Sequence, residues 1–181
     1  MTNCMRTSFA TAALAFLVTF PAAAQHSAMP AGMTHEEHQA QMKKDAELKR
    51  RGAAAMGFDQ DATTHHFRLR EDGGAIEVEA RAAGNPSVRD AVRSHLREIA
   101  QSFADGDFAK PFATHGEVPP GVAEMTRSKA SISYLFEETE HGGRVRIRTS
   151  TTAARDAVHA FLRYQIREHA TGDPLTVKVP S

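Results

Sequence analysis

Six side chains near the start of the chain have the chemistry of soft-metal ligands: His26, Met29, Met33, His35, His38 and Met42. Three of them follow an i, i+3, i+7 spacing, which places them on one face of a helix. Imidazole and thioether ligands together suit copper, and thioethers favour Cu(I). The pattern predicts a copper site, although a polar linker rich in methionine and histidine has the same composition.

Two further histidines, His95 and His169, lie in related segments. Residues 89–107 and 155–173 match at nine of 19 positions without a gap, which indicates an internal duplication. Each histidine aligns with a phenylalanine of the other segment. If the two helices run antiparallel, the imidazoles approach each other and form a pair that binds a metal or a small ligand. The alternative is two unrelated residues, with His169 interacting with a helix C-terminal dipole.

A row of arginines is the third candidate site. Arg144, Arg146 and Arg148 alternate along an expected strand, so they share one face of a sheet. They would bind an anion or a protein partner. They would equally form cross-strand ion pairs, since Glu77 and Glu79 occupy the equivalent strand of the first repeat.

Motifs of the common enzyme classes are missing from the sequence. There is no G-x-S-x-G, S-x-x-K, H-E-x-x-H, P-loop or G-x-G-x-x-G pattern, and these would mark nucleophilic, metalloprotease or nucleotide sites. The sequence predicts no catalytic residue. Its 22 basic and 22 acidic residues argue against nucleic-acid binding, which requires a basic surface.

The first 24 residues have the order of a secretory signal peptide. Arg6 precedes an apolar run at residues 10–20, and small residues end at Ala24. The run is too short to span a bilayer. Cleavage near Ala24 would remove Cys4, the one cysteine of the chain, so the mature protein is expected in the periplasm or secreted, without disulfides.

Residues 25–55 are expected to form a flexible Met/His-rich arm, followed by one domain at residues 56–181. The arm contains a polar helix, predicted to begin after Thr34 with a Glu37 capping box and to stop near Gly52. The mostly charged composition of this helix predicts loose attachment to the domain.

Two alternating stretches precede each repeated helix, and each pair is joined by a turn that contains Gly-Gly. One such unit buries too little surface to be stable alone. The fold class is therefore α+β: a duplicated ββα unit with a four-stranded antiparallel sheet and two helices on one face, preceded by the polar N-terminal helix. The connection at residues 107–130 is expected to hold one short helix, Val122 to Lys129.

The remaining histidines have simpler expected positions. Alternation sends His65 and His66 to opposite faces of the first strand. His159 is expected to face solvent, and His115 and His141 are expected in loops.

The chain resembles a family of small exported bacterial proteins of unknown function, whose members often carry the automatic name aspartate carbamoyltransferase. The resemblance rests on Met56 to Phe67, Pro119-Pro120-Gly121, Gly142 to Thr149 and His159 to Asp173. The S-x-R-T-R carbamoyl-phosphate loop has no match in the sequence. The resemblance supports the domain boundaries and assigns no residue roles.

These observations favour a periplasmic metal-binding or metal-tolerance accessory protein, with copper as the first metal to test. Two alternatives remain: a non-enzymatic interaction module that uses the charged sheet face, and a small enzyme with a histidine site between the two helices. The expected partner is a metal ion or an envelope protein.

Overall fold

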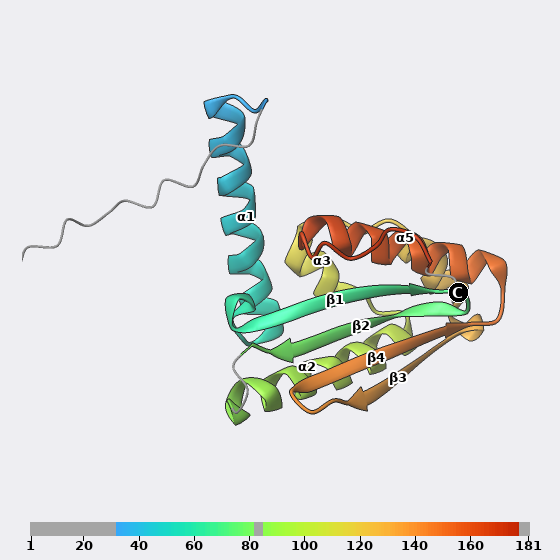
Figure 1. Ribbon diagram of the computed structural model, residues 1–181. Helices are drawn as coiled ribbons and strands as arrows, with labels where there is room; N and C mark the ends of the chain where they lie inside the picture. Colours follow the sequence, from blue (N-terminus) through green and yellow to red (C-terminus); the bar gives the residue numbers. More distant parts are fainter. Residues whose placement is uncertain (1–31, 82–84, 178–181) are drawn as a thin grey trace, which may run out of the picture.

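The computed structural model describes residues 32–81 and 85–177. It is an α+β fold with one four-stranded antiparallel sheet and five α-helices in that part of the chain (Figure 1). The elements are α1 (His35–Met56), β1 (Thr63–Arg70), β2 (Gly73–Ala80), α2 (Pro86–Asp105), α3 (Ala109–His115), α4 (Val122–Arg127), β3 (Ile132–Glu138), β4 (Gly142–Thr149) and α5 (Thr152–Glu168). The expected signal peptide lies outside the described residues.

The strands follow the order β1-β2-β4-β3, and all neighbours are antiparallel. The two hairpins therefore meet through their second strands. Glu77 of β2 lies opposite Arg144 of β4, so the second strands of the two expected repeats pair through opposite charges, as the sequence predicts.

One apolar core joins the sheet to α2 and α5. Strand alternation directs Phe67, Ile76 and Val145 toward this core, while α2 contributes Leu96 and α5 contributes Phe161. Helix α2 contacts β3 and β4, whereas α5 contacts β1 and β2. Each helix thus packs mainly on the hairpin of the other half of the chain, which ties the two halves into one unit.

Helix α1 begins as predicted and ends later than predicted. Thr34 and Glu37 form the capping box, with Glu37 N donating to Thr34 Oγ1 at 3.2 Å. The helix continues through Gly52 and stops at Met56, followed by Gly57 with φ +80°. Gly52 is an interior packing position, because a Cβ there would collide with the Gln60 side chain. The prediction of a stop at Gly52 is wrong for that reason.

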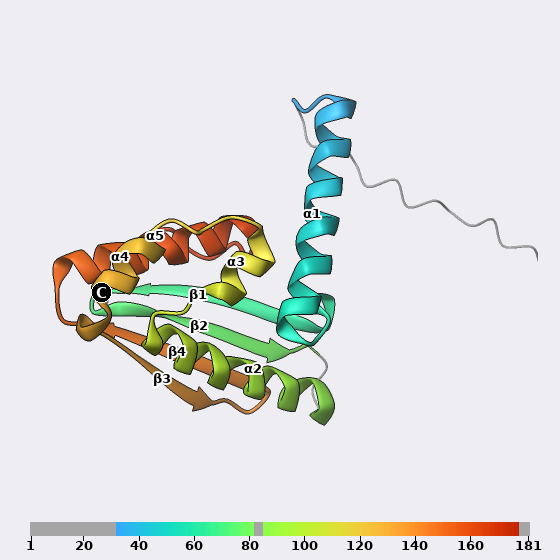
Figure 2. The same ribbon diagram turned by 180° about the vertical axis from the view of Figure 1, so that it is seen from behind.

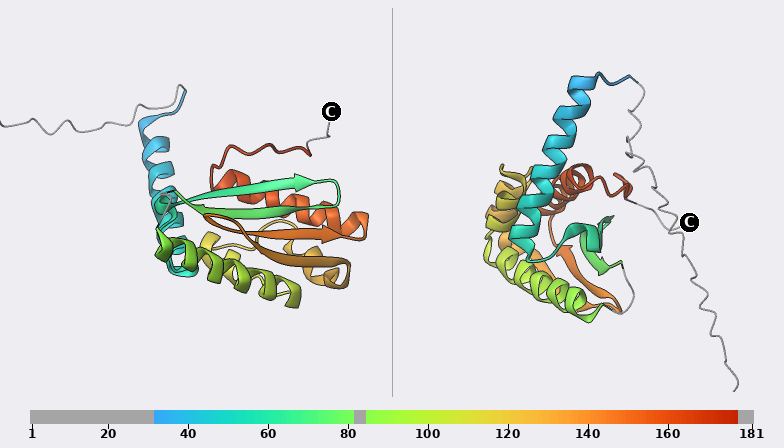
Figure 3. Two further views of the ribbon diagram at one scale, coloured as in Figure 1. Left: turned by 60° about the horizontal axis from the view of Figure 1, so that its bottom comes forward. Right: turned by 90° about the vertical axis from the view of Figure 1, so that its left-hand side faces the viewer.

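The two halves of α1 differ in their contacts. The first half projects away from the sheet (Figures 1 and 3). The rest of the helix, from Lys44 onward, packs against α3 and buries Leu48, and Lys44 Nζ lies 3.2 Å from Glu168 Oε2 of α5. The expectation of a loosely attached helix therefore describes only its first half.

The long connection after α2 holds two helices where the sequence predicts one. Helix α4 covers much of the predicted range, and α3 was not predicted (Figure 2). Pro111 sits in the first turn of α3, where proline costs no backbone hydrogen bond. Within the described ranges, no helix combines the length and apolar composition required to cross a membrane.

Candidate functional site

Four histidines line one partly open cavity of about 70 Å³. They come from four separate elements: His65 from β1, His95 from α2, His115 from α3 and His169 from the end of α5. The rest of the wall is largely apolar and includes Met56. The volume suits a few water molecules or a small ion with its ligands.

Local structure explains why these rings converge. His65 lies two residues before Phe67, so alternation along β1 turns it toward the core. His95 follows Val92 by three residues on the buried stripe of α2. His169 is the C-cap residue of α5, where the chain leaves the helix beside β1.

Ring contacts divide the cluster into two parts. His65 stacks on His169, with centroids 5.7 Å apart and an interplanar angle of 7°, and His115 meets His169 edge-on at 5.2 Å. His95 instead packs edge-on against Phe58 at 5.6 Å. The two histidines predicted to approach each other thus line the same cavity, but the aromatic neighbours of His169 are His65, Phe67 and His115.

Burial of His95 and His115, and partial burial of His65 and His169, keeps these imidazoles neutral. Desolvation, with smaller contributions from neighbouring ionisable groups, lowers the pKa of His65 and of His95 to about 4 and that of His169 to about 3. Burial also lowers the pKa of His115. At neutral pH every ring therefore keeps one unprotonated nitrogen, which is a metal ligand or a hydrogen-bond acceptor.

Three of the rings carry a buried nitrogen without a hydrogen-bond partner: His65 Nε2, His95 Nδ1 and His115 Nδ1. The other nitrogen of His115 lies 2.9 Å from Gln165 Oε1. Unpartnered buried polar atoms are rare in folded proteins, and these three belong to side chains that line one cavity.

No known family, curated protein or solved structure matches the chain. The resemblance given by the sequence therefore stays a prediction, and the candidate site rests on its own geometry.

The arm residues are spread along the first half of α1. His35 Nε2 lies 2.9 Å from Gln39 Nε2, His38 is half-buried, and Met42 is 53% exposed. Met33 precedes the helix and is half-buried. The other two predicted ligands, His26 and Met29, lie outside the described residues. In residues 32–81 and 85–177, no three His, Cys, Asp or Glu side chains are grouped closely enough to hold a metal ion.

The predicted arginine row lies on the face of the sheet that is turned away from the core, and most of it has internal partners. Arg144 binds Glu137 at 2.5 Å and approaches Glu77 at 3.6 Å. Arg146 donates to the carbonyl oxygens of Gly74 and Ile147, each at 2.6 Å, and its side chain also contacts Asp72. Arg148 differs, because its side chain is 69% exposed and lies 4.0 Å from Asp72.

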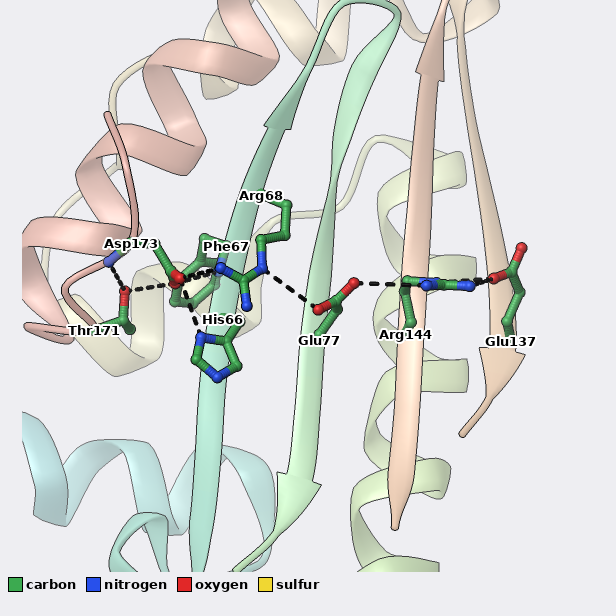
Figure 4. Close-up of polar contacts among 8 residues, drawn as sticks. All are labelled: His66, Phe67, Arg68, Glu77, Glu137, Arg144, Thr171 and Asp173. Carbon is green, nitrogen blue, oxygen red and sulfur yellow. Dashed lines mark hydrogen bonds and ion pairs between the residues drawn. The ribbon is translucent and has the colours of Figure 1, made fainter. Parts of the chain in front are cut away.

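A charged stripe, formed by Asp173, Arg68, Glu77, Arg144 and Glu137, crosses this face of the sheet (Figure 4). Signs alternate along the stripe, so each inner member lies between two opposite charges. His66 points to the same side and lies 3.1 Å from Asp173 Oδ1. The prediction that His65 and His66 face opposite sides of β1 is confirmed.

Two histidine positions differ from their predictions. His159 is buried, and its Nε2–H donates to the carbonyl oxygens of Arg70 at 2.9 Å and Gly73 at 3.0 Å. It closes the β1–β2 turn, so the prediction that it faces solvent is wrong. His115 is buried in the last turn of α3, so its predicted loop position is also wrong.

Sequence reasoning missed His65 and His115 as members of the site. For His65 a usable signal existed, since it lies two residues before Phe67 and therefore on the same, core-facing side of β1. For His115 the signal was absent, because its position depends on α3 folding back against α5.

Proposed function

We propose that the protein is an exported metal-binding protein that holds Cu(I) in the histidine cavity. The observation that carries the proposal is the convergence of four neutral imidazoles on one cavity, with three buried nitrogens left unpartnered. His169 contacts the rings of both His65 and His115, so His169 with one of these two rings is the first candidate ligand pair.

Copper(I) suits this site better than zinc. A structural zinc ion takes four ligands in a tetrahedral arrangement, and such a set is not grouped in the described residues. Cu(I) is satisfied by two or three soft ligands, and imidazole with thioether is a suitable combination. Met56, which also lines the cavity, would supply the thioether. Bound Cu(I) would also give a partner to buried histidine nitrogens that have no hydrogen bond.

Two surface grooves support access for the ion. His65 and His169 also line a groove of about 320 Å³ beside Thr63 and Arg81. His169 lines a second groove of about 230 Å³ between α1 and the end of α5. The stacked imidazole pair therefore separates the interior from the surface, and an ion reaches it without disruption of the core.

Internal duplication supports the same site. In two related ββα units, with both helices on one face of the sheet, equivalent helices would present residues to one shared interior. His95 and His169 come from the two related segments and line one cavity. The antiparallel pairing of β2 with β4 is the arrangement that such a duplication predicts.

The two alternative functions fit less well. An enzyme that uses these histidines as bases would need pKa values near the working pH, whereas burial lowers those of His65 and His169 to about 4 and about 3. An interaction module built on the arginine row would have to displace the internal partners of Arg144 and Arg146.

Anaerobic titration of residues 25–181 with Cu(I) tests the proposal. We expect one ion to bind more tightly than about 1 μM, a free energy of about −8 kcal/mol. His169→Phe should weaken binding by about 100-fold or more, ~3 kcal/mol, because it removes the ring that contacts both His65 and His115 while keeping an aromatic side chain.

The matched control removes the candidate ligands of the N-terminal arm and leaves the cavity unchanged. A variant with His35→Ala, His38→Ala and Met42→Leu should bind as the parent does. Substitution is cleaner than truncation at Ala53, since truncation also removes Leu48 from its buried position. Loss of binding in the arm variant, with binding kept in His169→Phe, would move the site to the arm. Absence of binding in the parent would end the copper proposal.

A further inference from the structure

One edge of the sheet is covered by another segment of the chain, and the other edge is open. At the β1 edge, the segment after α5 folds back, and the Asp173 carboxylate accepts the Phe67 N–H at 2.9 Å. Leu175 O accepts from Arg163 Nε at 2.8 Å and holds the same segment in place. At the other edge, β3 is the last strand in the order, and no described strand lies beyond it. An uncovered edge strand is a template for pairing with another chain.

The parity of the hydrogen bonds shows which groups β3 presents at its open edge. Ser150 N donates to Ser131 O, and Thr139 N donates to Gly142 O. Odd-numbered residues of this ladder therefore bond to β4, and the even-numbered residues point their N–H and C=O groups outward. The outward residues of β3 are Ile132, Tyr134, Phe136 and Glu138.

This strand is complementary to itself. An antiparallel pair of two β3 strands that overlaps over all of Ile132–Glu138 places Leu135 opposite Leu135 on the two-fold axis. Tyr134 then faces Phe136 of the second copy, so outward N–H and C=O groups meet each other, and the pair is aromatic. Leu135 is 58% exposed, an unusual exposure for leucine at the centre of a strand.

Charge supports the same register. Glu137 falls opposite Ser133 of the second copy, and Arg148 is the cross-strand neighbour of Ser133 on β4. The long side chain of Arg148 can reach over this small residue to the carboxylate of Glu137 from the other copy. This register places no two like charges opposite each other. It also gives a partner to Arg148, which is more exposed and more weakly paired than Arg144 and Arg146.

We propose that the partner of the β3 edge is a second copy of this chain, joined antiparallel with Leu135 on the axis. The product is a two-fold symmetric dimer with a continuous eight-stranded sheet. The charged stripe then runs through both copies by way of the Glu137–Arg148 contacts. The proposal does not depend on metal binding.

Engineered cysteines test the register directly. The chain from Gln25 to Ser181 has no cysteine, so Leu135→Cys introduces a single thiol on the proposed axis. Directly opposed residues in a non-hydrogen-bonded pair lie about 5 Å apart at Cβ, and mild oxidation should yield a covalent dimer. In Ser133→Cys the two thiols lie four residues apart along the strands, about 13 Å, and should not cross-link. Equal cross-linking of both variants would overturn the register.

Sedimentation measures the association without cross-linking. Over a series from about 1 to 100 μM, the parent should show a dimer, and Leu135→Lys should shift it to monomer because two ammonium groups would meet on the axis. Val118→Lys is the matched control, since Val118 is also exposed, at 62%, but lies outside the sheet; it should behave as the parent does. A parent that is monomeric throughout the series, or a dimer that Leu135→Lys leaves intact, would overturn the proposal.

Discussion

Acidification from pH 6.5 to about pH 4 should unfold the protein, with the histidine cavity as the cause. The pKa values of His65 and His95 fall to about 4 and that of His169 to about 3 in the folded state, against about 6.5 in an unfolded chain. Below pH 6.5 these imidazoles bind protons in the unfolded chain but stay neutral in the folded chain, so the free energy of unfolding falls as pH falls.

The size of this effect follows from linkage. Each histidine costs about 1 kcal/mol per pH unit within this window, so three together remove several kcal/mol by pH 4.5, on the scale of a domain's whole stability. The pKa of Asp173 is lowered from 3.8, so loss of its contribution falls below this window. The measurement is urea unfolding, followed by circular dichroism, at a series of pH values.

Phenylalanine variants separate the cavity from general acid sensitivity. His95→Phe and His169→Phe copy the residues that the sequence alignment places opposite them, Phe161 and Phe103. Each should reduce the slope of stability against pH by about one proton. His141→Gln, in the β3–β4 turn, should leave the slope unchanged. If the parent and both phenylalanine variants share one pH profile, the buried imidazoles do not control acid stability.

Asp173→Ala should cost about 3 kcal/mol of unfolding free energy. The side chain is 4% exposed, and its oxygens accept from Phe67 N, Thr171 Oγ1 at 2.8 Å and Arg68 at 2.5 Å. Burial alone would raise the pKa of this carboxyl, but these donors outweigh burial and lower it. Alanine leaves the buried Phe67 N–H without its acceptor and removes one of the two acidic partners of Arg68.

Chemical denaturation at neutral pH measures this loss. Asp173→Asn keeps one acceptor oxygen and should lose roughly half as much. Asp156→Ala removes an acid that is 63% exposed, and it should change stability by at most about 0.5 kcal/mol. An Asp173→Ala protein as stable as the Asp156→Ala control would show that the C-terminal segment does not hold the edge of β1.

Much of the fold was readable from the sequence because the signals were local. Alternation in residues 66–70 and 76–80, glycine turns and the Thr34 capping box each specify their own conformation. Opposite charges on equivalent strands led us to expect these strands side by side; β2 and β4 do pair, whereas β1 and β3 lie at opposite edges of the sheet. These features depend on neighbours along the chain or on simple complementarity.

The parts that could not be predicted depend on distant contacts. Helix α3 is short and contains Pro111, so its stability comes from packing against α1 and not from helix propensity. His159 was expected to face solvent because it aligns with Arg93 in the related segment. It is instead buried, and it donates to two carbonyl groups of a turn 86 and 89 residues away. The cavity combines residues from β1, α2, α3 and α5, and no local pattern encodes such a meeting.

The late position of Asp173 has a consequence for how the chain folds. Its contact with Phe67 joins residues 106 positions apart, which makes it one of the most non-local contacts of the fold, and such contacts form late. Because the chain is synthesised from its N-terminus, β1 is complete long before the segment that covers its edge has been made. During that interval the edge is open to self-association, so chaperone dependence should be greatest for chains shortened just before Asp173.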